Sequence, residues 1–419
     1  MAPLPPSPKV VVYHQTHHTR DGQRPISILP LIGRDDGAGS SRPSATHIVV
    51  AAVHINGADG DKPITLNDHA PDHARFDVLW SEVAAAQARG VRVLALLGGA
   101  AKGSYERLDV GRGGVSRQSF ETHYALLHGL LRRRRLDGVD LDVEEPMSLP
   151  GIVHLIDRLR ADFGPAFLLT MAPVAAALLR PYDPRCNLSG FSYADLERQR
   201  GHEIAWYHAQ FYCGWGDASQ PHMYATMVGL GPPGSGLGGA GGPAGLPPQA
   251  HLPGPIVWPA HRVVMGLVTN PANGPGFVPL DTSAEVMMQL QAATSAAAVA
   301  FPGVPGIRGG PFAGVSGWEY FNSMPGGEER PWEWAEWMSA ILGTTVEADG
   351  LPGNMQTVTP VGAANTKAPS TETNIDAEAA TATSKTASAA PWEADPDSEG
   401  GPDAPVPGAF EYTTDTEES

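Results

Sequence analysis

The sequence predicts an α/β fold in which eight parallel strands close into a (β/α)8 TIM barrel. Eight short apolar runs recur between residues 9 and 321, and helical patterns separate several of them. The runs are apolar almost throughout, rich in Val, Ile and Leu, rather than alternating with polar residues. Such runs, alternating with helices, are typical of parallel strands buried on both faces, and eight of them indicate a closed barrel.

The predicted strands follow one another along the chain with loops or helical segments between them. In order, they are residues 9–14, 47–55, 91–99, 136–145, 167–174, 204–212, 262–269 and 312–321.

Helices are predicted where apolar side chains recur at the spacing of one helical face. Segment 120–131 places Phe120, Tyr124, Leu127 and Leu131 in this way, and segments 151–164 and 284–300 show comparable patterns. In segment 330–338, Trp334 and Met338 are four residues apart, so we expect a last helix that packs on the core. A doubly wound open sheet is the alternative fold, but the segment "GGAAKGSY" (98–105) is a poor match to its phosphate-binding turn.

Two segments do not fit a packed core. Residues 229–255 are mostly Gly and Pro, which predicts a flexible insertion between the sixth and seventh strands. Residues 347–419 contain fourteen acids and two lysines, hence a net charge of −12 out of −17 for the whole chain. We therefore assign residues 1–346 to one catalytic barrel and residues 347–419 to a disordered acidic tail.

The remaining composition excludes several classes of function. No basic face indicates nucleic-acid binding, and no apolar stretch is long enough to span a membrane. Two cysteines, Cys186 and Cys213, make neither a disulfide framework nor a zinc pattern. The start of the sequence lacks the features of a signal peptide, so an intracellular, cytoplasmic protein is expected, with secretion by a non-standard route as the alternative. We expect a monomer without metal or cofactor.

The segment "LDGVDLDVEE" (136–145) sets carboxylates into an otherwise apolar strand. Because side chains alternate along a strand, Asp140, Asp142 and Glu144 share one face, which in a barrel points inward. Glu144 comes last, nearest the mouth where barrel enzymes carry their active sites. Carboxylates so close together cannot all ionise, so one of them can act as an acid near neutral pH. A structural ion-pair cluster and a magnesium or calcium site are the alternatives to this acid–base role.

This segment resembles the Asp-x-x-Asp-x-Asp-x-Glu signature of glycoside hydrolase family 18, the chitinases and related endo-β-N-acetylglucosaminidases. The signature lies on the fourth predicted strand, as in that family. The motifs "MAP" (171–173), "QFY" (210–212) and "GVSGW" (314–318) also stand at the ends of the strands where the family has them. The resemblance covers roughly residues 9–342 and implies the same barrel.

The resemblance implies a retaining glycosidase that uses substrate-assisted catalysis. Glu144 would protonate the leaving oxygen while the 2-acetamido group of the substrate attacks the anomeric carbon. Asp142 would orient that group, Asp140 would tune Asp142, and Tyr212 would donate its hydroxyl to the acetamide oxygen. The further residues implied or suggested to contact the sugar are Trp318, Gln210, Trp215 and Met171.

Two departures from the family pattern stand beside the site. The third strand reads Leu96-Leu97-Gly98-Gly99 where relatives usually have Ser-x-Gly-Gly, so the hydrogen-bond partner of Asp137 or Asp140 has to be found elsewhere. Cys213 follows Tyr212 where Asn or Asp is usual. We expect chitin or chitooligosaccharides as the substrate. The alternatives are an endo-β-N-acetylglucosaminidase that acts on N-glycans, and a weakly active or inactive chitin-binding lectin on the same barrel.

Overall fold

Eight parallel strands form a closed barrel in the computed structural model, which describes residues 8–33, 42–58, 60–111, 113–230, 256–300 and 311–343. Strand β1 pairs with both β2 and β9, which closes the barrel, and all eight predicted strands are confirmed. The strands are β1 (Lys9–His14), β2 (His47–Ile55), β4 (Arg92–Gly98), β5 (Gly138–Asp142), β6 (Leu168–Met171), β7 (Trp206–Gln210), β8 (Val263–Val268) and β9 (Gly314–Trp318).

A ninth strand, β3 (Ile64–Leu66), pairs antiparallel with the end of β2 and was not predicted. Its three residues are too few to show the periodicity of a strand. The predicted insertion (229–255, apart from its first two residues) and the acidic tail (347–419) lie outside the described residues.

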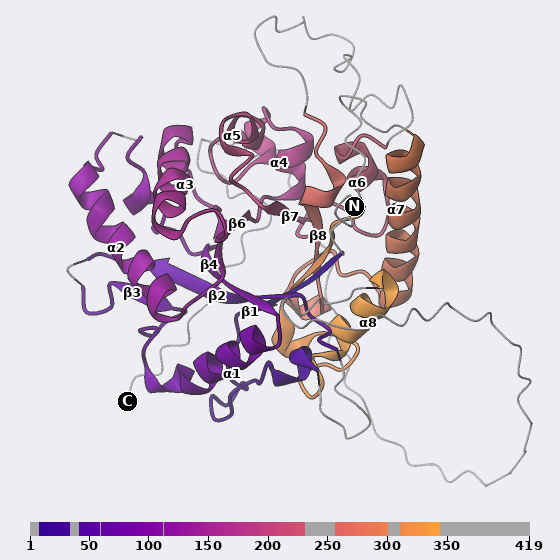
Figure 1. Ribbon diagram of the computed structural model, residues 1–419, viewed down its shortest axis with the longest axis horizontal. Helices are drawn as coiled ribbons and strands as arrows, with labels where there is room; N and C mark the ends of the chain where they lie inside the picture. Colours follow the sequence, from indigo (N-terminus) through magenta and orange to yellow (C-terminus); the bar gives the residue numbers. More distant parts are fainter. Residues whose placement is uncertain are drawn as a thin grey trace, which may run out of the picture. The chain divides into compact units, whose positions relative to one another are not determined.

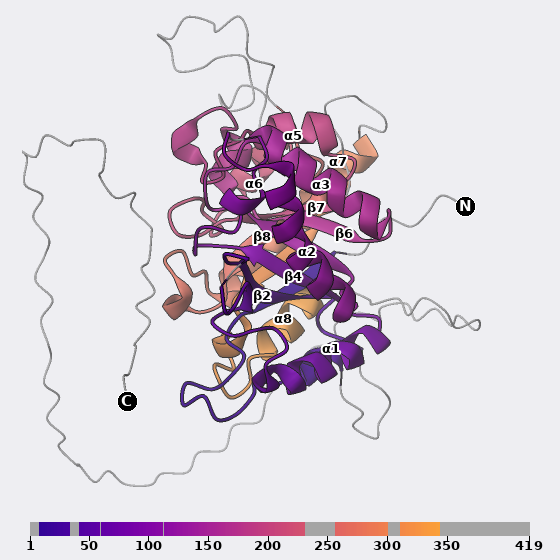
Figure 2. The ribbon, with the colours of Figure 1, turned by 90° about the vertical axis from the view of Figure 1, so that its left-hand side faces the viewer.

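Helices surround the barrel (Figure 1). In the side view, the strands lie between α3, α5 and α7 on one side and α1 and α8 on the other (Figure 2). Within the described residues, none of the helices has the length and apolar character needed to cross a membrane. The helices are α1 (Asp77–Ala88), α2 (Arg117–Arg133), α3 (Leu149–Phe163), α4 (Ala175–Leu179), α5 (Tyr193–Arg200), α6 (His222–Met227), α7 (Leu280–Ala300) and α8 (Glu333–Leu342).

Serine side chains fix where three of these helices begin. The side chains of Ser116, Ser148 and Ser192 accept hydrogen bonds from the backbone N–H groups three residues later, at the starts of α2, α3 and α5. The predicted helical segments lie within α2, α3 and α7, apart from Gly164, which follows the end of α3. Trp334 and Met338 of α8 are buried as expected.

Two apolar cores follow from the alternation of side chains along the strands. The larger core fills the space between the strands and the helices. The smaller one lies inside the barrel and includes Val11, Leu94, Leu96, Trp206 and Val264. The inner residues of the strands therefore form the base on which an active site at the mouth can rest.

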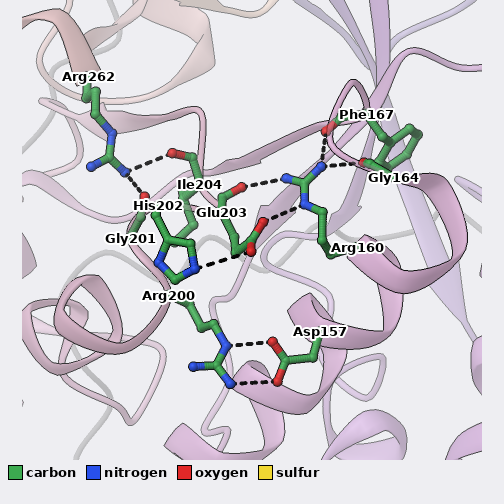
Figure 3. Close-up of polar contacts among 10 residues, drawn as sticks. All are labelled: Asp157, Arg160, Gly164, Phe167, Arg200, Gly201, His202, Glu203, Ile204 and Arg262. Atoms are coloured by element: carbon green, nitrogen blue, oxygen red, sulfur yellow. Dashed lines mark hydrogen bonds and ion pairs between the residues drawn. The ribbon is translucent and has the colours of Figure 1, made fainter.

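Two arginines fix the loop that leads into β7 (Figure 3). Arg160 of α3 donates to the carbonyl oxygens of Gly164 (2.6 Å), Phe167 (2.9 Å) and Glu203 (2.7 Å), and also to the Glu203 carboxylate (2.7 Å). Arg262, just before β8, donates to the carbonyl oxygens of Gly201 and Ile204 at 2.6 and 2.8 Å. These contacts join the starts of β6, β7 and β8, so they set the position of β7 within the barrel.

Replacing Arg160 with Met is expected to lower the free energy of unfolding by about 2–3 kcal/mol, because three carbonyls and a carboxylate lose their donor. The Arg160 side chain is only 17% exposed, so water does not fully replace these bonds. Urea denaturation measures the loss. The control is Arg185→Met, whose side chain is 87% exposed in its pair with Asp183 and should change little. Equal losses in the two variants would contradict the role given to Arg160.

Candidate active site

The acidic face of β5 points into the barrel, as the alternation predicts. Asp140 is fully buried and Asp142 is 6% exposed, while Val139, Leu141 and Val143 belong to the outer core. Glu144 follows the end of β5 and is half-buried. The carboxylates thus rise from the barrel interior toward its mouth.

Asp140 is held by hydrogen bonds from three other strands. It accepts from the Tyr13 hydroxyl of β1 (2.7 Å) and the Thr170 hydroxyl of β6 (2.6 Å), and Nδ1 of His208 on β7 lies 3.2 Å away. Burial by itself raises the pKa of Asp140, whereas the hydrogen bonds from His208, Thr170 and Tyr13 lower it by favouring the ionised form. These three donors stabilise the Asp140 carboxylate despite its complete burial.

The amide of Gln210 joins the two carboxyls nearest the mouth. Its Nε2 lies 3.3 Å from Oδ1 of Asp142, 3.1 Å from Oε1 of Glu144 and 2.9 Å from the carbonyl oxygen of Ala172. An amide nitrogen has two protons, so the three acceptors share them. Gln210 was predicted as a substrate-binding residue, and its observed contacts give it the further task of holding both carboxyls in place.

The pKa values of both of these carboxyls are raised. Burial, then the neighbouring Glu144 and Asp140, raise the pKa of Asp142 well above its ordinary value. Burial also raises the pKa of Glu144, and the Gln210 hydrogen bond partly opposes this. An anion at Asp140 below and two carboxyls of raised pKa above it give the site a proton to transfer near its mouth.

A small pocket opens above Asp142. Its lining includes Gln210, Tyr212 and Trp318 from the predicted set, with Tyr13 and His208 beneath them. Burial, then Asp142 and Glu144, raise the pKa of Tyr212 well above its ordinary value, so its hydroxyl remains a donor. The half-buried Trp318 ring lies 5.7 Å from the Tyr13 ring and supplies a flat apolar wall. An aromatic wall beside a donor and an acid suits a sugar ring that carries a polar substituent.

Two buried glutamates hold the loops around this pocket. Glu145, which faces away from the site, accepts from the backbone N–H groups of Gly103 and Tyr105, both at 2.7 Å. Glu319, next to Trp318, accepts from the backbone N–H (2.8 Å) and the hydroxyl (2.8 Å) of Thr16. The loop after β4 is thereby fixed relative to the end of β5, and the loop after β1 relative to the end of β9.

Four predicted site residues are not part of the pocket lining: Asp140 lies beneath it, Glu144 contacts the lining residue Gln210, and Met171 and Trp215 lie away from it. Met171 ends β6 with its side chain fully buried in the outer core, because strand alternation turns it toward the helices, and Ala172 lines the pocket instead. We therefore leave Met171 out of the proposed binding site. Trp215 is half-buried and packs against the outer core. Cys213 is half-buried with φ +52°, and Glu144 lies close enough to contribute to the raised pKa of its thiol.

Sequence reasoning missed Thr170 and His208, and it gave Tyr13 no definite role. Leu96 pairs in register with Asp140 and offers it no donor, so these three side chains supply the hydrogen bonds in its place. A signal was present: Thr170 and His208 are polar residues at inward positions of apolar strands. Asp137 lies at the other end of the acidic segment, where it accepts from the backbone N–H of Val93 at 2.8 Å.

The described part of the chain contains no cluster of three or more His, Cys, Asp or Glu side chains arranged to hold a metal ion.

Solved structures identify the family of this barrel, whereas no family model and no curated protein sequence matches the chain. A fungal endo-β-N-acetylglucosaminidase from glycosyl hydrolase family 18 is 36% identical, with a TM-score of 0.63 over 80% of this chain and 98% of its own. The chitinase ChiC from Aspergillus fumigatus is 43% identical, with a TM-score of 0.58 over 80% of this chain and 99% of its own. A putative chitinase A from Streptomyces coelicolor, 15% identical with a TM-score of 0.51, shares the fold.

The first two of these similarities extend over 80% of this chain and nearly the whole length of each relative. The chain therefore belongs to glycoside hydrolase family 18 and is a glycosidase.

Proposed function

We propose that this glycosidase is a retaining chitinase that cleaves β-1,4 bonds between N-acetylglucosamine units of chitin or chitooligosaccharides. The observation that carries the proposal is the Gln210 amide, which holds Asp142 and Glu144 side by side above the buried Asp140 anion. The chitinase from Aspergillus fumigatus, 43% identical, supports the choice of substrate.

In the proposed mechanism, Glu144 gives its proton to the glycosidic oxygen as the bond to the anomeric carbon breaks. The carbonyl oxygen of the substrate's own 2-acetamido group forms a bond to that carbon and closes an oxazolinium ring. Asp142 shares its proton with the Asp140 anion beneath it, so that its oxygen accepts the acetamide N–H and its carboxylate stabilises the positive charge that develops there. Tyr212 donates its hydroxyl to the acetamide oxygen and so orients it for attack.

Water then completes the reaction. Glu144, now a carboxylate, takes a proton from a water molecule that attacks the anomeric carbon and opens the oxazolinium ring. Two inversions at one carbon give net retention, and Glu144 regains its proton for the next cycle. Trp318 stacks beneath the sugar ring during both steps.

An endo-β-N-acetylglucosaminidase acting on N-glycans is the second candidate. The fungal relative of that activity, 36% identical over 98% of its length, favours it. The two reactions need the same acetamide chemistry, so the same residues would carry either one. A binding lectin is a poorer candidate, because this chain keeps Glu144 and buries it where its pKa is raised.

Chitooligosaccharides, a high-mannose glycopeptide and cellooligosaccharides distinguish these functions. We expect cleavage of the chitooligosaccharides, with the β-anomer formed first in proton NMR spectra. Cellooligosaccharides are the control, because they lack the acetamide nucleophile and should not be cleaved. Cleavage of the glycopeptide alone, between its two core GlcNAc units, would select the second candidate. Hydrolysis of cellooligosaccharides would contradict substrate assistance.

A further inference from the structure

Beneath the catalytic carboxyls, Trp206 and His208 of β7 both face the barrel interior. The indole nitrogen of Trp206 lies 2.6 Å from Nε2 of His208, and both side chains are buried. An indole N–H can only donate, so Nε2 must accept this hydrogen bond with its lone pair. Nε2 therefore carries no proton, and His208 cannot be an imidazolium while this bond exists.

The remaining hydrogen bonds then have only one consistent direction. A neutral imidazole with Nε2 unprotonated carries its proton on Nδ1, which lies 2.6 Å from the Tyr13 hydroxyl oxygen and 3.2 Å from Asp140. Because the Tyr13 oxygen accepts this proton, the Tyr13 hydroxyl donates its own to Asp140 at 2.7 Å. Trp206, His208 and Tyr13 thus form a chain of donors that ends on the Asp140 carboxylate.

We propose that His208 is a positioning residue that acts as a neutral hydrogen-bond donor, through Tyr13, to keep Asp140 ionised in the free enzyme. The effect of His208 on turnover rests on the proposed function, whereas its protonation state does not. This role also explains how Asp140 obtains a hydrogen-bond donor. On β4, which pairs with β5, Leu96 stands opposite Asp140 and offers no donor, and His208 on β7 supplies one instead.

The neutral state matters because of what lies above Asp140. The negative charge of Asp140 is one of the causes that raise the pKa of Asp142 and so keep a proton on it. An imidazolium at His208 would cancel that charge from below, whereas a neutral donor stabilises it without cancelling it. On the far side of His208, Lys9 and the His47 ring lie 4.8 and 4.9 Å from the centroid of the Trp206 ring, and His47 interacts electrostatically with His208. The other titratable groups that face Asp140 are Tyr105, Asp142, Tyr193 and Tyr212.

Two substitutions distinguish three possible roles of His208: a neutral hydrogen-bond donor, a charged partner of Asp140, and a residue that only fills space. In His208→Asn, the side-chain amide can place a neutral N–H near the position of Nδ1. In His208→Leu, the volume stays similar but the donor is lost. We expect His208→Leu to lower kcat about tenfold with little change in KM. Losing a donor raises the pKa of Asp140, so the acid limb of the pH–rate profile should move to higher pH.

His208→Asn is expected to restore kcat to within about threefold of the wild type and to return the acid limb toward its position. A wild-type profile in His208→Leu would mean that His208 only fills space. Equal impairment in both variants would point to a charged ring instead of a neutral donor. Either result would overturn the proposal.

Nitrogen-15 NMR of the full-length wild type reads the tautomer directly, with the His208 signals assigned by their absence from His208→Asn. The expected result is a neutral ring protonated on Nδ1, and a doubly protonated or Nε2-protonated ring would overturn the proposal. This measurement does not require activity. If no GlcNAc substrate is cleaved, the proposed function fails while the tautomer still decides the state of His208, even where His208→Leu does not fold.

Discussion

Replacing Glu144 with Gln is expected to lower kcat by about three orders of magnitude while the fold is kept. Gln has nearly the same shape but no proton to transfer to the glycosidic oxygen, and this transfer contributes about 10²–10⁴ in rate. Burial raises the pKa of the half-buried Glu144, which means that its neutral form is stabilised there, so a neutral amide of the same shape should cost little stability. Steady-state kinetics on chitooligosaccharides measures the loss, and thermal unfolding measures the stability.

The neighbouring Glu145 offers a matched control for this change. Its carboxylate holds the N–H groups of Gly103 and Tyr105 and faces away from the pocket, so Glu145→Gln loosens a loop without removing the acid. We expect that variant to lose about 1–2 kcal/mol of stability and to retain turnover. If turnover survived in Glu144→Gln and disappeared in Glu145→Gln, the catalytic acid would be Glu145, and the proposed mechanism would be contradicted.

The strand alternation of β5 could be read from sequence because it depends on local geometry alone. An apolar strand that places acids at every second position predicts both the inward face and the order in which Asp140, Asp142 and Glu144 approach the mouth. The outer position of Met171 follows from the same alternation, since Thr170 precedes it on the inner face beside Asp140. The motif "MAP" drew attention to the end of β6, and the face of the strand was the more informative signal.

The hydrogen-bond partners of Asp140 could not be assigned from any one segment. Tyr13, Thr170 and His208 come from three strands, and they meet only because the barrel closes and sets the register between its strands. An inward polar residue on each strand suggests an interior network, but which atoms pair depends on strand stagger that the sequence does not display. The same limit applies to Gln210, whose contacts to two carboxyls exist only in the folded barrel.

Replacing Asp142 with Asn is expected to lower kcat by about two to three orders of magnitude, because an amide has no proton to share with Asp140 and cannot become the carboxylate that stabilises the positive charge of the oxazolinium ion. Stability should change in the opposite direction. The pKa of Asp142 is raised in the folded state, so the neutral form is the one that folding favours. Its contribution to stability is present at low pH and is lost as pH rises through the raised value. Asn is never ionised and keeps the neutral contacts throughout.

The melting temperature of Asp142→Asn relative to the wild type should therefore rise with pH, starting above the ordinary carboxyl value of 3.8. Calorimetry across a pH series measures this difference. Asp137→Asn is the control on the same acidic segment: Asp137 caps the start of β5, away from the pocket, so its loss should reduce stability and leave kcat nearly unchanged. A difference in melting temperature that does not change with pH would mean that folding leaves the pKa of Asp142 unchanged, and it would contradict the raised pKa of this carboxyl.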